Sequence, residues 1–328
     1  MSFEPMVDLP AAEEALAVSV VVPVFNEASS LTELTERLHA VLSAIRPSEF
    51  EVLFVDDGST DGSWEAIRAL RKRFPDAVRA LRHRRNFGKA AALANGFAAA
   101  RGKIIVTMDA DLQDQPEEIP KFLETLRDGT VDVVSGWKRD RRDPIEKTLP
   151  SRVFNLLTRA ASGLKLHDFN CGFKAYRAEC AKGLRIYGEL HRFIPVLAHA
   201  EGYRVVEVAV DHAARVHGKS KYGSTRVVKG ILDLLSVFIL TRYLRRPGHF
   251  FGGVGLLSGF TGFCILAYLS AMKLFWGMGG IGTRPLFFLG ILLALLGVQL
   301  VSIGILGELV IKTSSRPMHS AALRERLG

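Results

Sequence analysis

The sequence predicts an α/β domain with a mostly parallel sheet and helices on both faces, followed by two membrane-spanning helices. Strand-like and helix-like segments alternate up to residue 137, and two long uncharged segments lie near the carboxyl terminus. Of the 328 residues, 48% are hydrophobic, and the mean hydropathy of +0.17 is high for a soluble protein. This composition excludes a disordered or collagen-like chain and suggests that part of the protein lies in lipid.

Each expected strand is a short run of mostly apolar, often β-branched residues, and each expected helix carries apolar residues at helical spacing. The expected strands are 18–24, 51–55, 78–81, 104–108 and 131–137, and the expected helices are 31–42, 63–74 and 89–100. The continuous run Val18–Val24 is typical of a strand that is buried on both faces. The alternation of strand and helix predicts parallel strands joined by crossover helices.

Polar clusters follow four of the expected strands at the point where each strand ends. They are Asn26–Glu27, Asp56–Asp57, Asn86–Lys89 and Asp109–Asp111. In open α/β sheets, ligands bind outside the carboxyl ends of the strands. Four such clusters in corresponding positions therefore predict one site at this edge of the sheet.

The last of these clusters predicts a site for a divalent metal ion. Asp109 and Asp111 lie two residues apart after a buried strand, and Gln113 offers a further oxygen. Mg²⁺ and Mn²⁺ prefer such oxygens and often complete their coordination with substrate phosphates. The sequence has no GxxxxGK[ST] loop and no GxGxxG, so P-loop hydrolysis and Rossmann-type redox chemistry lose their main support.

Two uncharged segments of 23 residues each, Phe250–Met272 and Pro285–Gly307, are the predicted membrane spans. As helices they reach roughly 34 Å, enough to cross a hydrocarbon core of about 30 Å. Small residues in the first span permit close helix packing and leave a homo-oligomer open. These residues are Gly252, Gly253, Gly255, Gly259 and Gly262.

Basic residues flank the two segments unevenly. Five lie on the outer flanks, and two lie at the ends of the connecting loop 273–284. The five are Arg242, Arg245, Arg246, Lys312 and Arg316. By the positive-inside rule, we expect an inner-membrane protein whose large amino-terminal part faces the cytoplasm. Residues 1–17 lack the features of a signal peptide, so both chain ends are expected on that side.

The segment 227–243 is apolar on most of its surface and is interrupted by Lys229, Asp233 and Arg242. It reads as an amphipathic helix in the membrane interface, with a short core helix as the alternative. The expected organisation is a tail (1–17), a catalytic domain (18–226), the interfacial helix with a linker (227–249), two transmembrane helices (250–311) and a cytoplasmic tail (312–328).

Several motifs, taken together, resemble family 2 glycosyltransferases of the GT-A fold. The motifs are Val21–Glu27, Val55–Ser59, Asn86–Lys89 and Asp109–Asp114. The further motifs Asp168–Lys174 and His191–Pro195, with two carboxyl-terminal spans, look similar to polyprenyl-phosphate glycosyltransferases. Examples are the dolichyl-phosphate mannosyltransferases and the bacterial undecaprenyl-phosphate glucosyltransferases. The resemblance covers roughly residues 18–312, and in place of the QxxRW motif of processive synthases the chain shows only His191–Phe193.

The resemblance implies a role for each matching residue. The residues expected to bind the nucleotide-sugar are Pro23, Phe25, Glu27, Asp56, Asp57, Lys89, Asp109, Ala110, Asp111, His191 and Arg192. The expected catalytic residues are Asp109, Asp111 and Asp168, and the expected metal ligands are Asp109, Asp111 and Gln113. Structural alternatives stay open: Asp57 in a turn, Pro23 at a strand end, Lys89 in solvent, and His191 or Asp168 as a cap.

Two basic clusters predict where an anionic acceptor binds. The first has six cations in fifteen residues, between Lys138 and Arg152, and the second surrounds Lys219–Lys221. Arg and Lys are the usual ligands of a phosphate monoester. The expected lipid-phosphate ligands are Lys138, Arg139, Arg152, Lys219, Ser220 and Lys221. The alternative is attraction to acidic headgroups without a part in catalysis. Despite a net charge of +9, we see no nucleic-acid-binding motif.

The function that the resemblance implies is inverting, metal-dependent sugar transfer from a nucleotide-sugar to undecaprenyl phosphate at the cytoplasmic membrane face. UDP-glucose is the favoured donor, ahead of GDP-mannose, UDP-N-acetylglucosamine and modified arabinose donors. Because a phosphate monoester is largely a dianion at neutral pH, Asp168 is expected to position groups more than to act as a base. A processive polysaccharide synthase would need more spans. A non-catalytic nucleotide-sugar-binding scaffold would not need the paired carboxylates.

Overall fold

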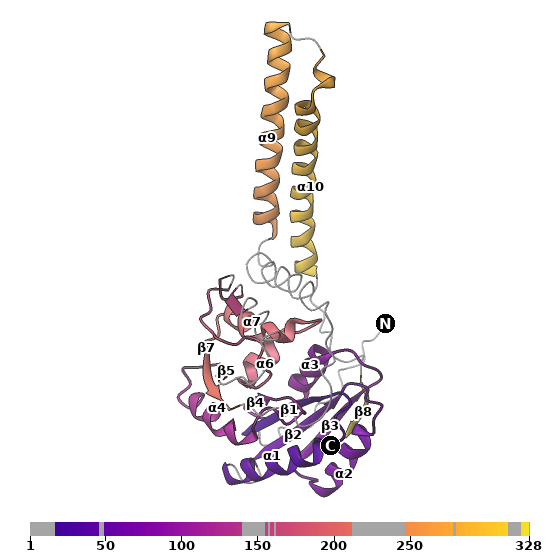
Figure 1. Cartoon of the computed structure of the whole chain (residues 1–328), viewed down its shortest axis with the longest axis vertical. Coiled ribbons are helices and arrows are strands. Elements are labelled where there is room, and N and C mark those ends of the chain that lie inside the picture. The colour runs from indigo at the N-terminus through magenta and orange to yellow at the C-terminus, as the bar shows by residue number, and fades with distance from the viewer. Residues whose placement is uncertain are drawn as a thin grey trace, which may run out of the picture. The chain divides into compact units, whose positions relative to one another are not determined.

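The computed structural model of the chain describes residues 17–45, 49–139, 155–156, 158–160, 162–211, 247–277, 280–313 and 323–327 (Figure 1). It divides into two compact units, Met1–Leu235 with Met318–Gly328, and Ser236–Pro317. The first unit holds the sheet, and the second holds two long apolar helices. The predicted interfacial helix 227–243 lies outside the described residues.

The described strands form one sheet in the order β7-β5-β6-β4-β1-β2-β3-β8. Their bounds are β1 (Val18–Val24), β2 (Phe50–Asp56), β3 (Val78–His83), β4 (Ile104–Thr107), β5 (Val133–Lys138), β6 (Lys174–Arg177), β7 (Val205–Val210) and β8 (Leu323–Leu327). Strand β1 runs parallel to β2 and β4, β2 is parallel to β3, and β5 is parallel to β7. Strand β6 is antiparallel to β4 and β5, and β8 is antiparallel to β3. The predicted mostly parallel sheet is therefore confirmed.

Alternate residues of the central strands face two different helical layers. Val20, Val22 and Phe54 belong to the same buried cluster as residues of helices α1 (Leu31–Ile45), α2 (Ser63–Arg73) and α4 (Ile119–Thr125). On the opposite face, α3 (Lys89–Ala99) packs so closely that a Cβ at Gly96 would collide with Val21. The sheet thus carries helices on both faces, with α1 and α2 on one side and α3 on the other (Figure 1).

The order of the strands predicts a ligand-binding crevice at the carboxyl ends of β1 and β4. The chain runs outward from β1 through β2 to β3, and then returns to the other side of β1 with β4. In parallel sheets, such a reversal leaves a crevice between the two neighbouring strand ends, where ligands bind. Residues 25–27 follow β1, and residues 108–111 follow β4, so both predicted clusters border this crevice.

The antiparallel strand β6, which the sequence did not reveal, brings a distant segment to the same edge. Lys174 pairs with Thr107 in register, and the Thr107 hydroxyl donates to the Gly172 carbonyl at 2.9 Å. The segment 168–174 therefore reaches the carboxyl end of β4. It is followed by α6 (Ala178–Gly183), the 3-10 helix η2 (Leu190–Phe193) and α7 (Ile194–Ala200).

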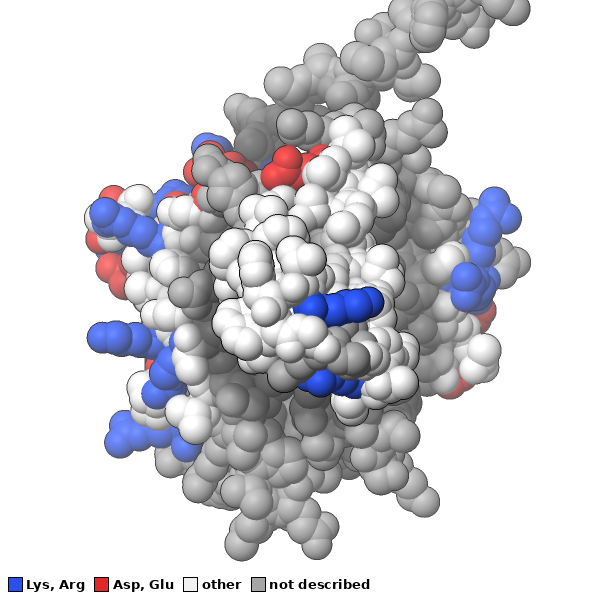
Figure 2. Space-filling view, turned by 90° about the horizontal axis from the view of Figure 1, so that it is seen from above, with Lys and Arg blue, Asp and Glu red and all other residues white. Residues whose placement is uncertain are grey.

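The second unit contains α9 (Pro247–Trp276), a 3-10 turn η4 (Ile281–Thr283) and α10 (Pro285–Thr313). Within them, Phe250–Trp276 and Pro285–Val310 have mean hydropathies of 1.8 and 2.6 and are long enough to cross a membrane. Both contain the corresponding predicted span. The end of the helix pair that faces the viewer in Figure 2 is mostly uncharged, with a few basic side chains.

Glycines bring α9 and α10 into close contact. A Cβ at Gly297 would lie 2.6 Å from the Gly255 carbonyl oxygen and from the Gly259 Cα, and a Cβ at Gly262 would lie 2.6 Å from the Gly290 carbonyl oxygen. Of the small residues noted in the first span, Gly255, Gly259 and Gly262 thus serve packing within the chain. A Cβ at Gly253, by contrast, would meet no heavy atom within 4 Å.

This packing makes a testable prediction for two alanine substitutions. Gly297→Ala should separate the helices and lower the stability of the pair by about 1–3 kcal/mol, because the added methyl group overlaps backbone atoms. Gly253→Ala is the matched control and should have little effect. The measurement is denaturation of the full chain in mixed micelles by rising dodecyl sulfate, followed through energy transfer between labels on α9 and α10. Equal denaturation midpoints for the two variants would contradict the packing.

Candidate active site

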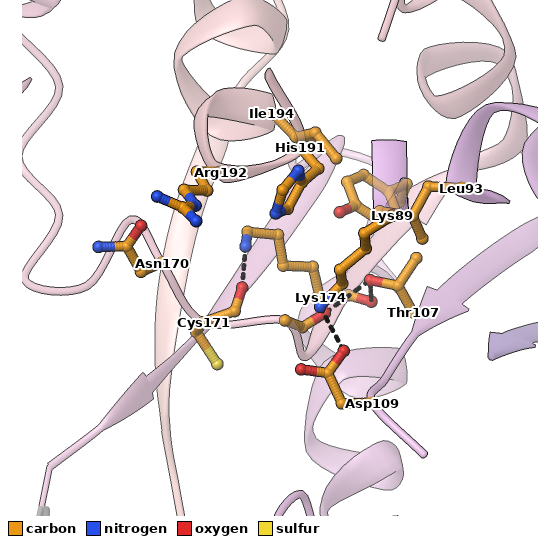
Figure 3. Close-up of a pocket in the computed structure, with 12 residues that line it drawn as sticks. Lys89, Leu93, Thr107, Asp109, Asn170, Cys171, Lys174, His191, Arg192 and Ile194 are labelled. Atoms are coloured by element: carbon orange, nitrogen blue, oxygen red, sulfur yellow. Dashed lines mark hydrogen bonds and ion pairs between the residues drawn. The ribbon is translucent and has the colours of Figure 1, made fainter. Parts of the chain in front are cut away.

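A pocket of about 170 Å³ lies at the carboxyl end of β4 (Figure 3). It is bordered by α3, by the end of β4, by the segment before β6, by β6 itself and by the start of α7. Its lining residues are Lys89, Leu93, Thr107, Asp109, Asn170, Cys171, Gly172, Lys174, Tyr176, His191, Arg192 and Ile194. Four residues predicted from the sequence, Lys89, Asp109, His191 and Arg192, therefore line one pocket.

Asp109 is held in this pocket by two contacts. Its Oδ1 forms an ion pair with the ammonium group of Lys89, the first residue of α3. Its carboxyl group also packs against Gly172, because a Cβ at that position would lie 2.9 Å from Oδ2 and 3.0 Å from Cγ. The glycine thus leaves a space that the carboxylate occupies, and a larger residue would displace it.

Asp111 and Gln113 lie on the turn that follows. Leu112 between them has φ of 60°, a conformation that is uncommon for residues with a Cβ, and its side chain is buried. Asp111 is 7% exposed and accepts the Gln113 backbone N–H at 3.2 Å. Such backbone strain is found where the surrounding structure fixes a functional turn.

These oxygens fit a hard divalent cation that shares its coordination with substrate. Among the described residues there is no group of three or more His, Cys, Asp or Glu able to hold a metal alone. The available donors are two carboxylates and the Gln113 amide, and the space at Gly172 admits one of the carboxylates. Mg²⁺ typically binds through one or two carboxylates and completes its octahedron with phosphate and water oxygens.

The carboxylate of Asp57 holds the loop before α3. Its Oδ1 accepts the Phe87 N–H at 2.8 Å and lies 2.7 Å from His83 Nδ1, and its Oδ2 accepts the Gly88 N–H at 2.8 Å. Asn95 Nδ2 lies 2.9 Å from His83 Nε2, so the amide donates there and the Nδ1 proton points to Asp57. This buried chain of contacts fixes the loop that carries Lys89.

The neighbouring Asp56 is fully buried at the end of β2. Its Oδ1 accepts the Ser59 N–H at 3.0 Å, and its Oδ2 lies 3.3 Å from Arg82 Nε without an aligned hydrogen bond. Ser59 in turn binds the loop after β1, since its hydroxyl accepts the Asn26 N–H at 2.9 Å. The Ser63 hydroxyl accepts the Glu27 N–H at 3.0 Å. The loops after β1 and β2 are therefore one hydrogen-bonded unit.

The other residues predicted to contact the nucleotide border the crevice without lining the pocket. Pro23 lies in β1 opposite Val55, and Phe25 and Glu27 follow that strand, all three partly exposed. Ala110 is buried between Asp109 and Asp111. The structure places all of them near the carboxyl ends of β1 and β4, and their contact with a nucleotide stays a prediction.

Lys138, predicted as a lipid-phosphate ligand, forms an ion pair with a carboxylate of the protein. Its Nζ lies 3.1 Å from Asp114 Oδ1, and the lysine side chain is 14% exposed. Burial lowers the pKa of Lys138, but Asp114, Cys171 and Asp109 together raise it by more, so the net pKa lies above its usual value. Asp114 Oδ2 also accepts the Asp109 N–H at 3.5 Å, so this pair supports the turn at Asp109. Arg139 is exposed, and Arg152, Lys219, Ser220 and Lys221 lie outside the described residues.

Asp168 and His191 differ in their relation to the pocket. Asp168 is 2% exposed and accepts the Asn170 N–H at 3.0 Å, so it fixes the segment that lines the pocket without lining it. His191 does line it, and its Nδ1 has no hydrogen-bond partner. Burial, together with the nearby Lys89, Arg192 and Lys174, lowers the pKa of His191 to about 2. Its imidazole is therefore neutral at physiological pH.

Sequence reasoning missed Lys174, which lines the pocket although it is only 2% exposed. Its ammonium donates to the Cys171 carbonyl, and burial lowers its pKa. The only sequence signal is its place at the end of the motif Asp168–Lys174. In the same motif, Cys171 is buried and its pKa is raised to about 12 by burial, so a reactive thiolate is not available there.

Comparisons with known proteins agree with this geometry. The family model "Glycosyl transferase family 2" matches residues 19–184, which is 166 of the 328 residues. The chain is 42% identical over 306 residues to a dodecaprenyl-phosphate galacturonate synthase of Rhizobium johnstonii, covering 92% of this chain and 90% of that protein. It is 38% identical over 293 residues to an undecaprenyl-phosphate 4-deoxy-4-formamido-L-arabinose transferase of Pseudomonas paraeruginosa, covering 89% and 84%.

Solved structures share the fold at low identity. A glucosyl-3-phosphoglycerate synthase from Mycobacterium tuberculosis, in complex with Mn²⁺ and UDP-glucose, has a TM-score of 0.51 and 19% identity, covering 69% of this chain and 80% of that one. A mannosyl-3-phosphoglycerate synthase from Rubrobacter xylanophilus has a TM-score of 0.52 and 17% identity, covering 68% and 74%. They confirm the expected GT-A type of sheet. With its family matched over half its length and a relative this similar over nearly all of it, the chain belongs to glycosyl transferase family 2 and is a glycosyltransferase.

Proposed function

We propose that this glycosyltransferase moves a sugar from a nucleotide-sugar to a polyprenyl phosphate, such as undecaprenyl phosphate, at the cytoplasmic face of the inner membrane. The observation that carries the proposal is the Asp109 carboxylate, packed on Gly172 and paired with Lys89, at the wall of a basic pocket beside the crevice between β1 and β4. The names of both relatives include a polyprenyl-phosphate acceptor. Two helices long enough to cross a membrane support a lipid substrate.

The donor binds with its diphosphate at the turn after β4. Asp109, Asp111 and Gln113 are the residues that would hold Mg²⁺ or Mn²⁺ there. Such a cation offsets the charge that develops on the leaving nucleoside diphosphate. Lys89, kept in place by the Asp57 contacts, holds Asp109 before the donor binds and then faces the diphosphate. The nucleoside lies along the crevice formed by Pro23, Phe25 and Glu27, with Asp56 below.

The acceptor needs no strong base. The second pKa of a phosphate monoester is about 6, so the lipid phosphate already carries a nucleophilic oxyanion at neutral pH. Its oxygen attacks the anomeric carbon from the side opposite the diphosphate, which inverts the configuration. Asp168 acts as a positioning residue, because it holds the Asn170 backbone at the pocket. Arg139, with Arg152, Lys219, Ser220 and Lys221, stays the proposed phosphate-binding set. Lys138 is better explained as support for Asp114.

The path of the chain supports the proposed cytoplasmic position of the catalytic domain. The segment after the second apolar helix includes β8, which pairs with β3 of the sheet in the first unit. The segments before and after the helix pair are thus parts of one domain. Two membrane crossings satisfy this requirement, and the uneven flanking charge supports a cytoplasmic position for that domain.

The donor expected from the sequence, UDP-glucose, is not supported by the names of these relatives. Neither relative's name contains glucose: one names galacturonate and the other 4-deoxy-4-formamido-L-arabinose. UDP-glucose therefore has no support among these relatives, and the donor sugar is better sought among modified sugars.

A transfer assay tests the proposal. Purified full-length protein with Mn²⁺, a panel of nucleotide-sugars and undecaprenyl phosphate should give a chloroform-soluble sugar product, and EDTA should abolish it. Asp109→Asn and Asp111→Asn should each lower kcat by at least about 100-fold, a loss expected when charge on the leaving group is no longer offset. Asp168→Asn should lose less than either at pH 8, because the acceptor is already ionised.

Other outcomes identify the competing functions. A long polymer in place of a glycolipid would indicate a processive synthase. Nucleotide-sugar binding without turnover for any donor would indicate a scaffold. Product formation that EDTA leaves unchanged would contradict the metal site.

The loop that carries Lys89 makes a separate prediction. Asp57→Asn removes one of the oxygens that accept backbone N–H groups, so we expect a loss of about 1–3 kcal/mol of stability and a higher KM for the donor. The KM for the lipid should stay nearly unchanged. Asp128→Asn, in an exposed turn, is the control. Thermal unfolding measures the loss of stability, and donor-dependent kinetics measure the change in KM. A wild-type KM for the donor in Asp57→Asn would refute the role of Asp57 in positioning the loop that carries Lys89.

A further inference from the structure

The pocket beside Asp109 carries more positive than negative charge. Its lining includes three cationic side chains, Lys89, Lys174 and Arg192, and one carboxylate, Asp109. Lys89 is paired with Asp109 and Arg192 with Glu189, so Lys174 is the lining cation that forms no ion pair with a carboxylate of the described residues. Figure 3 shows the Lys174 side chain ending between Cys171, His191 and Arg192, whereas Lys89 reaches toward Asp109.

Lys174 is the most costly of these cations to bury. It is 2% exposed, its ammonium donates to the Cys171 carbonyl, and it forms no ion pair with a carboxylate of the described residues. The carboxylates of Asp168 and Asp109 act on it only from farther away. A buried charge without a paired counter-ion is strongly unfavourable, so an anion supplied by a ligand would relieve it.

Two further side chains complete the basic wall. Arg192 forms an ion pair with the half-exposed Glu189 at 3.2 Å, and a guanidinium with five N–H donors can bind a second acceptor while it keeps this contact. His191 lies between the cations, and its lowered pKa reflects burial together with their positive potential. The neutral imidazole adds a polar ring to this wall without adding charge.

We propose that Lys174 and Arg192, assisted by His191, bind a carboxylate on the donor sugar, so that the enzyme uses a uronosyl nucleotide in preference to the matching neutral sugar. This inference rests on the proposed function, in which Asp109 lies at the donor diphosphate. The sugar is attached directly to that diphosphate, so it enters the pocket that Asp109 borders. At about 170 Å³, the pocket is smaller than the roughly 300–1,000 Å³ of a pocket for a whole ligand. It fits one part of the substrate, such as a sugar ring.

The diphosphate itself does not account for the surplus charge. In the proposed function, the negative charge of the diphosphate is already compensated at the pocket wall by the Lys89 ammonium and by a divalent metal that Asp109 would hold. The lipid phosphate is the other possible anion, but it would have to bring its prenyl chain to a lysine that is 2% exposed. A carboxylate at the far side of a bound sugar ring reaches Lys174 without that difficulty.

The test compares acidic and neutral donors that differ only at one carbon. The purified full-length enzyme is assayed with UDP-galacturonate against UDP-galactose, and with UDP-glucuronate against UDP-glucose, at saturating undecaprenyl phosphate. In at least one pair, kcat/KM should favour the acid by about 100-fold or more, because a buried basic site rejects the analogue that leaves it unpaired. Arg192→Gln should reduce this preference to below about 10-fold, because the acidic donor loses more kcat/KM than the neutral donor does.

Two more variants keep the test decisive. Lys174→Gln should reduce the preference for the acidic donor as Arg192→Gln does. If the Lys174→Gln variant does not fold, the result for Arg192→Gln decides the test. Arg192→Lys should retain part of the preference, because the charge remains. Arg127→Gln, at a surface position whose side chain is 77% exposed, is the control for loss of a cation.

The outcomes separate this inference from the function on which it rests. No transfer from any donor by the wild-type enzyme would refute the proposed function. Efficient transfer with equal kcat/KM for acid and neutral donors would leave that function intact and refute the carboxylate site. Equal losses for both donors in Arg192→Gln would also refute it and assign the cations to the diphosphate. If Arg192→Gln instead raised the KM for undecaprenyl phosphate with either donor, Lys174 and Arg192 would be assigned to the lipid phosphate.

Discussion

The contact between the Asp109 carboxylate and Gly172 is the constraint on which the site depends. It joins two segments that are more than sixty residues apart, the end of β4 and the segment before β6. Pairing of β4 with β6 in register brings them together, and the bond from the Thr107 hydroxyl to the Gly172 carbonyl fixes their spacing. Since a methyl group at residue 172 would lie about 3 Å from the carboxylate and force it to shift, the backbone there helps to set where the carboxylate lies.

Buried polar contacts hold the loops around the site in place. The chain from Asn95 through His83 to Asp57 ends on two backbone N–H groups of the loop before Lys89. The Lys138–Asp114 pair likewise fixes the turn at Asp109, because Asp114 accepts the Asp109 backbone N–H. In both cases a charged residue acts by fixing a loop. Loops that carry ligand-binding groups gain precision when such second contacts lock them to rigid elements.

The sequence predicted the central part of the fold because its signals are local. Strands such as Val18–Val24 are continuous β-branched runs, and β1 to β4 were placed within a few residues of their observed bounds. Strand β6 has four residues with no alternation, and β8 pairs only through tertiary contact with β3, so neither was visible. Of the four strand-end clusters expected to form one site, Lys89 and Asp109 line the pocket, together with His191 and Arg192, which the family resemblance had indicated. Lys138 looked like an anion ligand because its partner, Asp114, lies across the fold and not along the chain.

We propose that Asp109, in the space left by Gly172, holds a divalent cation for the donor diphosphate. The most direct measurement is the affinity for Mn²⁺ in the presence of UDP, followed by the paramagnetic resonance signal of free Mn²⁺. The account predicts that Asp109→Asn and Gly172→Ala each weaken binding at least about 10-fold. Gly183→Ala, whose Cβ would lie 3.6 Å from the nearest atom, should bind like wild type. Wild-type Mn²⁺ affinity in Asp109→Asn and Gly172→Ala would contradict the account.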